Sequence, residues 1–271
     1  MQSDEKAGKS GSAGVGAAWQ KAVSSPDTSY ATRKVPLVEV EYFSLSDYVR
    51  NVVEALAQSG GRSILEAGCG SGKLSLALAF LGYEVTALDI SADVLSNLTS
   101  NAARLESESE RSFRIRTVCF DLERMPFDEG AFDAVTNEGV VEHWTDRAAR
   151  VDVIREMGRV VRPGGRVIIY VPNGRHPLRR WWKLTRYPGY RQDDAVPWFR
   201  YDCPTLEQEM SEAGLRHVRT DGISPYSSLR VWPDLLPLRA AASLMERFLP
   251  HPPFIRRRMG FNLSGIGTKP E

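Results

Sequence analysis

The sequence predicts an α/β fold in which helices cover both faces of a doubly wound parallel sheet. Short apolar segments alternate with segments of helical periodicity from about residue 44 to residue 171. The last of these, Arg166–Val171, is a continuous apolar run of the kind found in buried parallel strands. This alternation is typical of sheets with right-handed crossovers, which bind ligands beyond the carboxyl ends of their strands.

The first half of the chain supplies four expected strands. Ser44 and Asp47 resemble a capping box, so we expect a helix from Ser44 to the Gly60-Gly61 pair. Ser91 is expected to cap a later helix. The expected strands are Ser63–Ala67, Tyr83–Asp89, Arg114–Asp121 and Phe132–Asn137, and a further helix is expected over Lys73–Leu81.

The second half continues the pattern with two interruptions. Asp146 is expected to cap a helix that Pro163-Gly164-Gly165 ends, and Arg166–Val171 follows as the fifth strand. A helix over Thr205–Ala213 and strands over Leu215–Ile223 and Phe261–Thr268 complete the expected elements. We expect one domain over residues 31–271, with insertions at about 173–203 and 224–259.

Residues 1–30 are rich in Gly, Ser and Ala and contain little to bury, which predicts a disordered tail. Trp19 is the exception, because a single Trp in such a tail is suited to fold back over a ligand.

The composition is that of a soluble globular protein, with 42% hydrophobic and 25% charged residues. No apolar run is long enough to span a bilayer, and the first twenty residues lack the apolar core of a secretory signal. Cys69, Cys119 and Cys203 are widely spaced, which argues against a disulfide framework or a zinc site. We therefore expect a cytoplasmic protein without a bound metal.

The net charge of +1 conceals an asymmetry along the chain. Residues 1–150 carry 15 Lys/Arg and 22 Asp/Glu, and residues 151–271 carry 20 and 12, which gives balances of −7 and +8. The basic half could attract an anionic acceptor or a membrane surface, at which the protein would lie peripherally. Alternatively, the two halves neutralise each other in one domain. The sequence lacks the concentrated basic stripe of a nucleic-acid binder, so no nucleic-acid partner is expected.

The segment Ile64–Gly72, with the sequence ILEAGCGSG, carries the clearest functional signal. An apolar strand enters a glycine-rich turn that opens a helix, whose first backbone N–H groups are available to a ligand. Glycines at alternate positions let the backbone approach that ligand closely. Asp89 ends the next strand, where its carboxylate can accept hydrogen bonds from both hydroxyls of a ribose.

A glycine-rich turn followed by an acidic residue also describes dinucleotide-binding dehydrogenases. Here the glycines are spaced GxGxG and not GxGxxG, and Glu66 places a negative charge where a phosphate would bind. A buried carboxylate at that point is suited to a cationic ligand group, such as the amino group or the sulfonium of S-adenosylmethionine.

Six segments together resemble class I S-adenosylmethionine-dependent methyltransferases of the methyltransferase type 11 kind, which act on small molecules. LEAGCGSG resembles their motif I and ALDIS their acidic second-strand end, and CFDLERMPFDEGAFDAV is similar to the segment across their third and fourth strands. NEGVVEHWTD, VVRPGGRVIIYVPN and FNLSGIGTKPE resemble the regions after strand four, at strand five and at the closing strand. The resemblance implies a seven-stranded Rossmann-like sheet in the order 3-2-1-4-5-7-6, with strand seven antiparallel.

The resemblance also implies a set of cofactor-binding residues. Asp121 would meet the adenine amino group, Glu66 would contact the methionine end, and Asn137 would offer its backbone carbonyl to the cofactor amine. The full expected set is Glu66, Ala67, Gly68, Cys69, Gly70, Gly72, Asp89, Ile90, Asp121, Leu122 and Asn137.

The acceptor side of the site is expected from two regions. His143 follows the fourth strand and is a candidate general base, the alternative being that it packs against the following helix. Residues 173–203 lie where the family has its acceptor lid, and Arg179, Trp181 and Trp182 are its candidate substrate contacts. Such a lid could cover an anionic, aromatic or lipophilic acceptor or dock at a lipid surface, and the alternative is a solvated basic face over an aromatic cluster.

The expected function is transfer of a methyl group from S-adenosylmethionine to O, N or C of a small or medium-sized molecule. Two alternatives remain open at this point. One is a partner subunit that binds the cofactor without catalysis, and the other is a nicotinamide-dependent oxidoreductase. The sequence identifies neither the acceptor nor the oligomeric state.

Overall fold

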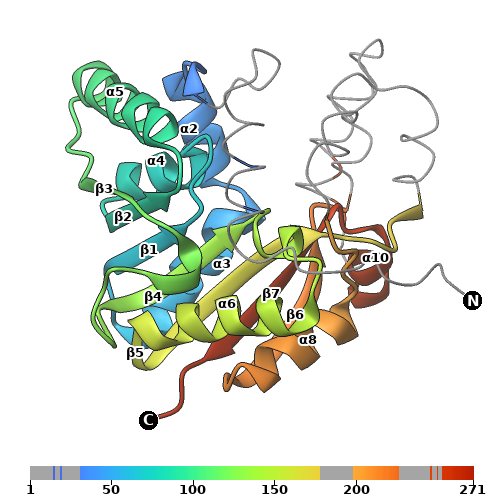
Figure 1. Cartoon of the computed structure of the whole chain (residues 1–271). Helices are drawn as coiled ribbons and strands as arrows, with labels where there is room; N and C mark the ends of the chain where they lie inside the picture. Colours follow the sequence, from blue (N-terminus) through green and yellow to red (C-terminus); the bar gives the residue numbers. More distant parts are fainter. Residues whose placement is uncertain are drawn as a thin grey trace, which may run out of the picture.

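A computed structural model of the 271-residue chain describes residues 15, 19, 31–177, 198–225, 245, 249 and 252–271 (Figure 1). The strands are β1 (Ser63–Ala67), β2 (Glu84–Asp89), β3 (Ile115–Cys119), β4 (Phe132–Glu138), β5 (Val161–Pro172), β6 (Arg216–Ile223) and β7 (Asn262–Thr268). The helices are α2 (Leu37–Ser44), α3 (Asp47–Ser59), α4 (Lys73–Phe80), α5 (Ala92–Ser109), α6 (Arg147–Val160), α8 (Cys203–Glu212) and α10 (Pro253–Met259), with short 3-10 helices η2 (Leu122–Arg124) and η3 (Val141–His143).

The seven strands form one sheet in the order β3-β2-β1-β4-β5-β7-β6. The pairs from β3 to β5 are parallel, and β7 runs antiparallel to both β5 and β6. The predicted order and the predicted antiparallel strand are both confirmed. The sheet order reverses direction at β1, so the carboxyl ends of β1, β2 and β4 meet at the switch point, where open α/β sheets bind ligands.

Alternating strand residues pack against two separate apolar layers. Ile64 and Ile168 face a layer that contains α3, α4 and α5, and Leu65 and Val167 face a layer that contains α6 and α8. The helices therefore cover both faces of the sheet (Figure 1), and successive residues of β1 and β5 are buried on both sides. This explains why these strands are continuous apolar runs.

The beginning of the domain differs from the prediction. The helix expected from Ser44 starts at Asp47, and Ser46 caps it by accepting a hydrogen bond from the Val49 amide at 3.5 Å. Ser44 instead ends α2, which was not predicted, and its hydroxyl donates to the Glu41 carbonyl at 2.6 Å. Both serines precede the same apolar periodicity, so spacing alone did not distinguish them.

The Pro163-Gly164-Gly165 segment was expected to lie between a helix and a strand, and it lies within β5. Phe132 pairs with Val161 and Ala134 with Arg166, so the register shifts across these residues. A Cβ on Gly165 would lie 2.6 Å from the backbone oxygen of Asp133. The close approach of two strands therefore requires a glycine there.

The described ends of the first insertion lie together. Asn173 and Tyr201 form a parallel bridge, and the Gly174 amide donates to the Tyr201 carbonyl at 2.8 Å. Residues 178–197 lie outside the described residues, as do most of residues 226–251. Within the second insertion, α10 was not predicted.

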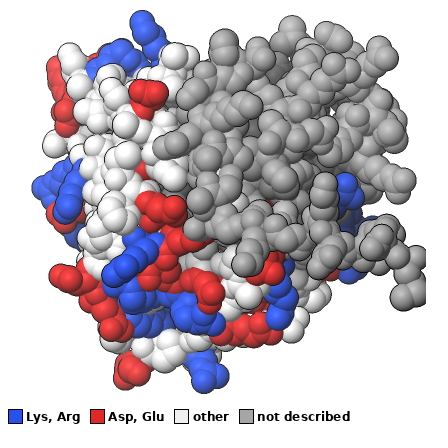
Figure 2. All heavy atoms as spheres, viewed as in Figure 1, with Lys and Arg blue, Asp and Glu red and all other residues white. Residues whose placement is uncertain are grey.

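Ion pairs join the acidic and basic halves of the sequence. Arg162 pairs with Asp133 at 2.7 Å, and Arg147 pairs with Glu212 at 2.6 Å. Figure 2 shows acidic and basic side chains interspersed on the described part of one face. Within the described residues, no helix is long and apolar enough to cross a membrane.

Candidate cofactor and acceptor site

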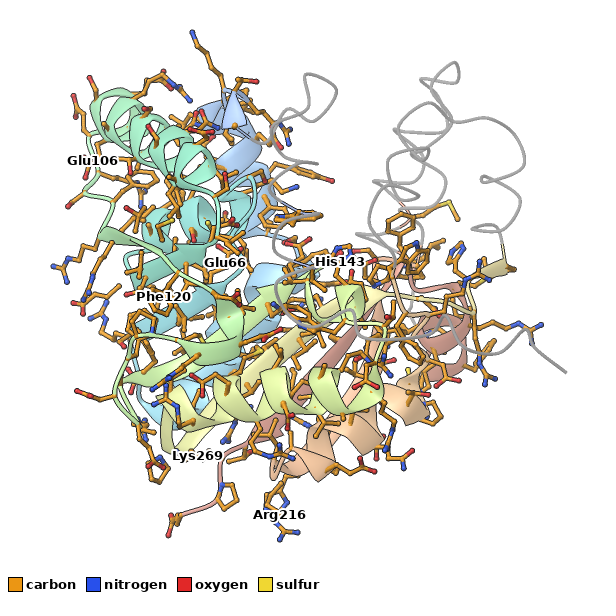
Figure 3. All side chains as sticks on the ribbon, in the orientation of Figure 1. Glu66, Glu106, Phe120, His143, Arg216 and Lys269 are labelled. Carbon is orange, nitrogen blue, oxygen red and sulfur yellow. The ribbon has the colours of Figure 1, made fainter. Side chains whose placement is uncertain are left out.

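A cavity of about 340 Å³ lies at the carboxyl ends of the central strands. Figure 3 shows Glu66 and His143 at this edge of the sheet, and Arg216 and Lys269 at the opposite edge. The cavity contains eight of the eleven predicted cofactor residues together with His143. The described residues that line it are Val15, Trp19, Arg33, Glu66, Gly68, Cys69, Gly70, Ser71, Lys73, Leu74, Asp89, Ile90, Asp121, Leu122, Glu138, Gly139, Val140, His143, Trp144 and Asn262.

The glycine-rich turn forms the floor of the cavity between β1 and α4. The amides of Gly68 and Cys69 both donate to the Leu88 carbonyl, at 2.8 and 2.9 Å, which fixes the turn to the end of β2. Gly68 has φ +81°, and a Cβ there would lie 2.6 Å from Cγ2 of Val140. Backbone conformation and packing therefore both require glycine at this position.

Gly70 and Gly72 differ in what surrounds them. A Cβ on Gly70 would meet no protein atom within 4 Å, so this residue leaves open space beside the cavity. A Cβ on Gly72 would lie 2.5 Å from Cδ1 of Leu98, which packs α4 against α5. Gly70 thus provides room for a ligand, whereas Gly72 allows close helix packing and does not line the cavity.

Asp89 is buried at the end of β2, and its two oxygens are held by the turn. Oδ2 accepts from the Gly70 amide at 2.9 Å, and Oδ1 accepts from the Ser91 amide at 3.0 Å. Burial raises its pKa, and these backbone hydrogen bonds oppose that rise. Each carboxylate oxygen has further lone pairs, so Asp89 retains the capacity to bind ribose hydroxyls.

Asp121 and Leu122 approach the cavity from the segment after β3. The predicted strand Arg114–Asp121 is shorter in the structure, since β3 ends at Cys119 and Asp121 caps η2. One oxygen of Asp121 accepts from the Glu123 amide at 3.0 Å. Ile90 lines the cavity from the end of β2. This set supplies a carboxylate and apolar walls, which suit a nucleobase with an amino group.

Glu66 lies 2% exposed beneath the cavity, and its Oε2 accepts a hydrogen bond from the Ser75 hydroxyl. Burial raises its pKa to about 8, the Ser75 hydrogen bond opposes the rise, and the nearby Glu138 carboxylate adds to it. A cationic group bound beside Glu66 would lower this pKa, because a nearby opposite charge favours the ionised carboxylate. The site is therefore suited to a ligand with a positive charge.

Glu138, Lys73, Arg33 and Asn262 line the same cavity but were not among the predicted site residues. Glu138 is the last residue of β4, one position beyond Asn137, so the strand-end rule that selected Asn137 could also have found it. Asn262 could not be found in this way, because β7 is antiparallel and its first residue reaches the same edge.

Asn137 and Ala67 lie beneath the cavity lining, both fully buried. The Asn137 side-chain amide donates to the Ala67 carbonyl at 2.7 Å, which ties the end of β4 to the end of β1. The predicted contacts of these two residues with the cofactor stay predictions.

His143 ends η3 and lines the cavity with Trp144. The ring of Trp19 lies 5.0 Å from the imidazole ring between centroids, at an interplanar angle of 39°. Trp19 and Val15 both line the cavity, so part of the N-terminal segment covers the site. The predicted substrate contacts Arg179, Trp181 and Trp182 lie outside the described residues.

Buried interactions hold η3 against the end of the first insertion. The Phe199 amide donates to the Glu142 carbonyl at 2.6 Å, and the guanidinium carbon of Arg150 lies 3.7 Å from the Phe199 ring centroid. Arg150 also donates to the carbonyls of Trp144 and Thr145, at 3.0 and 2.8 Å. The wall that carries His143 is therefore positioned by residues on α6 and at the end of the insertion.

Comparison with known proteins agrees with this site. Residues 65–169 match the family described as methyltransferase domain. The human protein named "Probable tRNA methyltransferase 9B" is 31% identical over 159 residues, which cover 58% of this chain and 30% of that protein. The ubiquinone biosynthesis O-methyltransferase of Alkalilimnicola ehrlichii is 39% identical over 138 residues, which cover 51% of each. The chain thus matches about a third to a half of the length of these curated relatives.

Solved structures share the fold. The phosphoethanolamine N-methyltransferase 2 of Haemonchus contortus, in complex with S-adenosyl-L-methionine, superposes with a TM-score of 0.57 at 14% identity. That superposition covers 93% of this chain and 60% of the other. The complex of the Haloferax volcanii Trm112 methyltransferase activator with a methyltransferase gives a TM-score of 0.54 at 17% identity, covering 87% and 94%.

The sheet order, the glycine-rich turn and the matched domain define the class. Residues 65–169 match a methyltransferase domain, and the sheet order and the site agree with a class I S-adenosylmethionine-dependent methyltransferase whose cofactor is S-adenosylmethionine. The lining agrees with that cofactor, because Asp89 can accept hydrogen bonds from a ribose, Glu66 can bind a cationic group, and Gly70 leaves open space beside the cavity.

Proposed function

We propose that this chain catalyses methyl transfer from S-adenosylmethionine to O, N or C of a small or medium-sized molecule. The observation that carries the proposal is one cavity in which Asp89, the glycine-rich turn and Glu66 lie on the cofactor side and His143 lies among the remaining walls. When bound, the cofactor supplies a methyl group already activated by its sulfonium. The residues then bind and orient the two reactants, which contributes up to ~7–11 kcal/mol in well-aligned systems.

The roles of the residues follow from their positions. Asp89 accepts the ribose hydroxyls, Glu66 faces the methionine end, and Asp121 with Leu122 receives the adenine. His143 is the candidate base for an acceptor hydroxyl, and a neutral amine acceptor needs no base. The names of the relatives refer to tRNA in one case and to ubiquinone biosynthesis in another, so they do not choose the acceptor.

The test uses the purified chain with S-adenosylmethionine labelled in its methyl group. Cell extract is divided into small metabolites, lipids and tRNA, and each fraction is assayed for label, with Asp89→Ala as the inactive control. We expect label in the small-metabolite or lipid fraction. Label in tRNA alone would contradict the small-molecule proposal. Binding of S-adenosylhomocysteine without label in any fraction would indicate a non-catalytic partner subunit.

A further inference from the structure

The cavity extends past the cofactor-binding strands. The sheet order places β2, β1, β4, β5 and β7 side by side. Asp89 and Glu138 are the last residues of β2 and β4, and Glu66 is the next-to-last residue of β1. If the ribose lies at β2 and the methionine end at β1, as the proposed function requires, the methyl group points toward β4 and β7. The side chains there, Glu138 and Asn262, then face the acceptor.

Asn262 has a buried oxygen that no protein group satisfies. Its amide nitrogen donates to Oη of Tyr48 at 2.6 Å, whereas its Oδ1 is buried and has no hydrogen-bond partner. Tyr48 is itself held, because Oη of Tyr170 donates to its carbonyl at 2.8 Å and the two rings lie 4.8 Å apart. A buried oxygen left without a hydrogen bond is unfavourable, and a ligand that donates a hydrogen bond would remove this cost.

Glu138 provides a second acceptor of hydrogen bonds in the same cavity. No described side chain donates a hydrogen bond to its carboxylate, and its electrostatic partner is Lys73. The Lys73 ammonium also makes a cation–π contact with Phe43, at 4.3 Å from the ring centroid. Burial raises the pKa of Glu138, which makes a further positive or donating group beside it favourable.

The overall charge of the described lining also favours an acceptor that is positively charged or donates hydrogen bonds. Its cationic side chains are Arg33 and Lys73, and its carboxylates are Glu66, Asp89, Asp121 and Glu138. The cofactor carries one net positive charge, from an ammonium, a sulfonium and a carboxylate, so negative charge remains in excess. The basic composition of residues 151–271 suggested an anionic acceptor, but this lining would repel one.

We propose that Glu138 and Asn262 form the acceptor subsite and select a hydrogen-bond donor, an amine above all, over a carboxylate or phosphate. Both residues line the same cavity and can accept hydrogen bonds from an acceptor bound there, and a charge-assisted hydrogen bond to Glu138 is the stronger of the two. The selection is asymmetric, because an acceptor without a donor leaves Oδ1 of Asn262 buried and unpaired.

The test extends the labelled-methyl assay to the charge of its products. Small-metabolite extract is methylated by the wild-type chain and separated on cation- and anion-exchange columns. We expect the label in the cationic fraction. Glu138→Gln keeps the shape but not the charge, and should lower incorporation at least tenfold, while calorimetric affinity for S-adenosylhomocysteine changes less than threefold. Asp152→Asn, at an exposed position on α6, is the matched control and should behave as wild type.

Three results would overturn the subsite. Label that elutes only with anionic products would show that the acceptor is not a donor of this kind. A fall of tenfold or more in S-adenosylhomocysteine affinity for Glu138→Gln would make Glu138 a cofactor ligand instead. Incorporation by Glu138→Gln and Asn262→Ala equal to wild type would place the acceptor elsewhere. Intact S-adenosylhomocysteine binding with no labelled product at all would contradict the proposed function itself. The acceptor subsite rests on that function and would then be rejected as well.

Discussion

Arg150 and Glu209 form a buried, two-pronged ion pair that ties α6 to α8. Nη2 of Arg150 lies 2.7 Å from Oε1 of Glu209, and Nε lies 3.1 Å from Oε2. Both side chains are almost fully buried, and the Tyr201 hydroxyl donates to Oε2 of Glu209 at 2.6 Å. Every charge in this cluster therefore has a partner, which is the condition for keeping an ion pair in a protein interior.

We expect Arg150→Met to destabilise the fold by about 3–5 kcal/mol, because Glu209 would remain buried without its partner. The double variant Arg150→Met/Glu209→Gln should recover part of this loss, since the glutamine oxygen still accepts from Tyr201. Urea unfolding measures the free energy of unfolding of the wild-type chain, of Arg150→Met and of the double variant. Arg155→Met breaks an exposed pair with Asp152 on the same helix and should cost less than about 1 kcal/mol. An equal loss for Arg150→Met and Arg155→Met would show that burial does not govern this pair.

Gly70 and Gly72 of motif I offer a matched comparison. Gly70→Ala places a methyl group in open space, so its cost to stability is limited to the positive φ, about 1 kcal/mol, while the methyl group obstructs the cavity. Gly72→Ala has the same backbone cost and also collides with Leu98, which adds about 1–3 kcal/mol.

Calorimetric binding of S-adenosylhomocysteine and thermal melting separate the two effects. Gly70→Ala should lose affinity with a small change in melting temperature, and Gly72→Ala should lose more melting temperature than affinity. The opposite order would mean that Gly72, and not Gly70, faces the cofactor.

The features that the sequence predicted correctly depend on local patterns. Ser91 and Asp146 each precede an apolar helical periodicity, and both accept the hydrogen bond expected of a cap. Asp89 is the last residue of a buried strand, so its place at the sheet edge could be derived from the strand alone. Each of these relationships joins residues that are close in the sequence, so the local pattern largely determines where their side chains lie.

The features that were missed depend on residues brought together by the whole fold. Asn262 reaches the cavity because β7 inserts antiparallel between β5 and β6, and its partner Tyr48 lies on α3, 214 residues away. The Trp19–His143 contact joins two segments with no common pattern. Periodicity carries no information about such pairs.

Asp89→Ala should weaken S-adenosylhomocysteine binding on the order of ten- to a hundredfold. The change removes charge-assisted hydrogen bonds to the ribose, each worth about 1.5–3 kcal/mol. Calorimetry measures the affinity, and melting temperature monitors the turn that Asp89 holds through Gly70 and Ser91. Asp93→Ala removes an exposed carboxylate four residues further on and should leave binding unchanged. Unaltered affinity in Asp89→Ala would remove the ribose assignment.

Cofactor binding should depend on pH through Glu66. In the unliganded chain its pKa is raised to about 8, so it is mostly protonated at pH 7. A cationic ligand favours the ionised form and must displace that proton below pH 8. Affinity for S-adenosylhomocysteine should therefore rise as pH increases from 6 to 8, by up to about tenfold per unit, and then level off.

Calorimetry in buffers of different ionisation enthalpy should detect proton release at pH 7. Glu66→Gln cannot ionise, so it should bind more weakly and lose both the pH dependence and the proton release. A wild-type affinity that is flat between pH 6 and 8 would show that no cationic group of the cofactor meets Glu66.

The last prediction concerns His143, whose imidazole lines the cavity against Trp19. If it is the general base, His143→Gln should lower the turnover number by ~10²–10⁴-fold on the acceptor found in the labelled-methyl screen. The wild-type rate should rise with pH as the imidazole loses its proton, and the variant should lose this dependence. Trp19→Ala removes the neighbouring ring but leaves the imidazole, so it should retain the pH dependence. If His143 only packs, His143→Gln should instead lower the melting temperature and keep both the rate per folded molecule and its pH profile. Such a result would favour an amine acceptor, which can be methylated without a base and agrees with the subsite at Glu138 and Asn262.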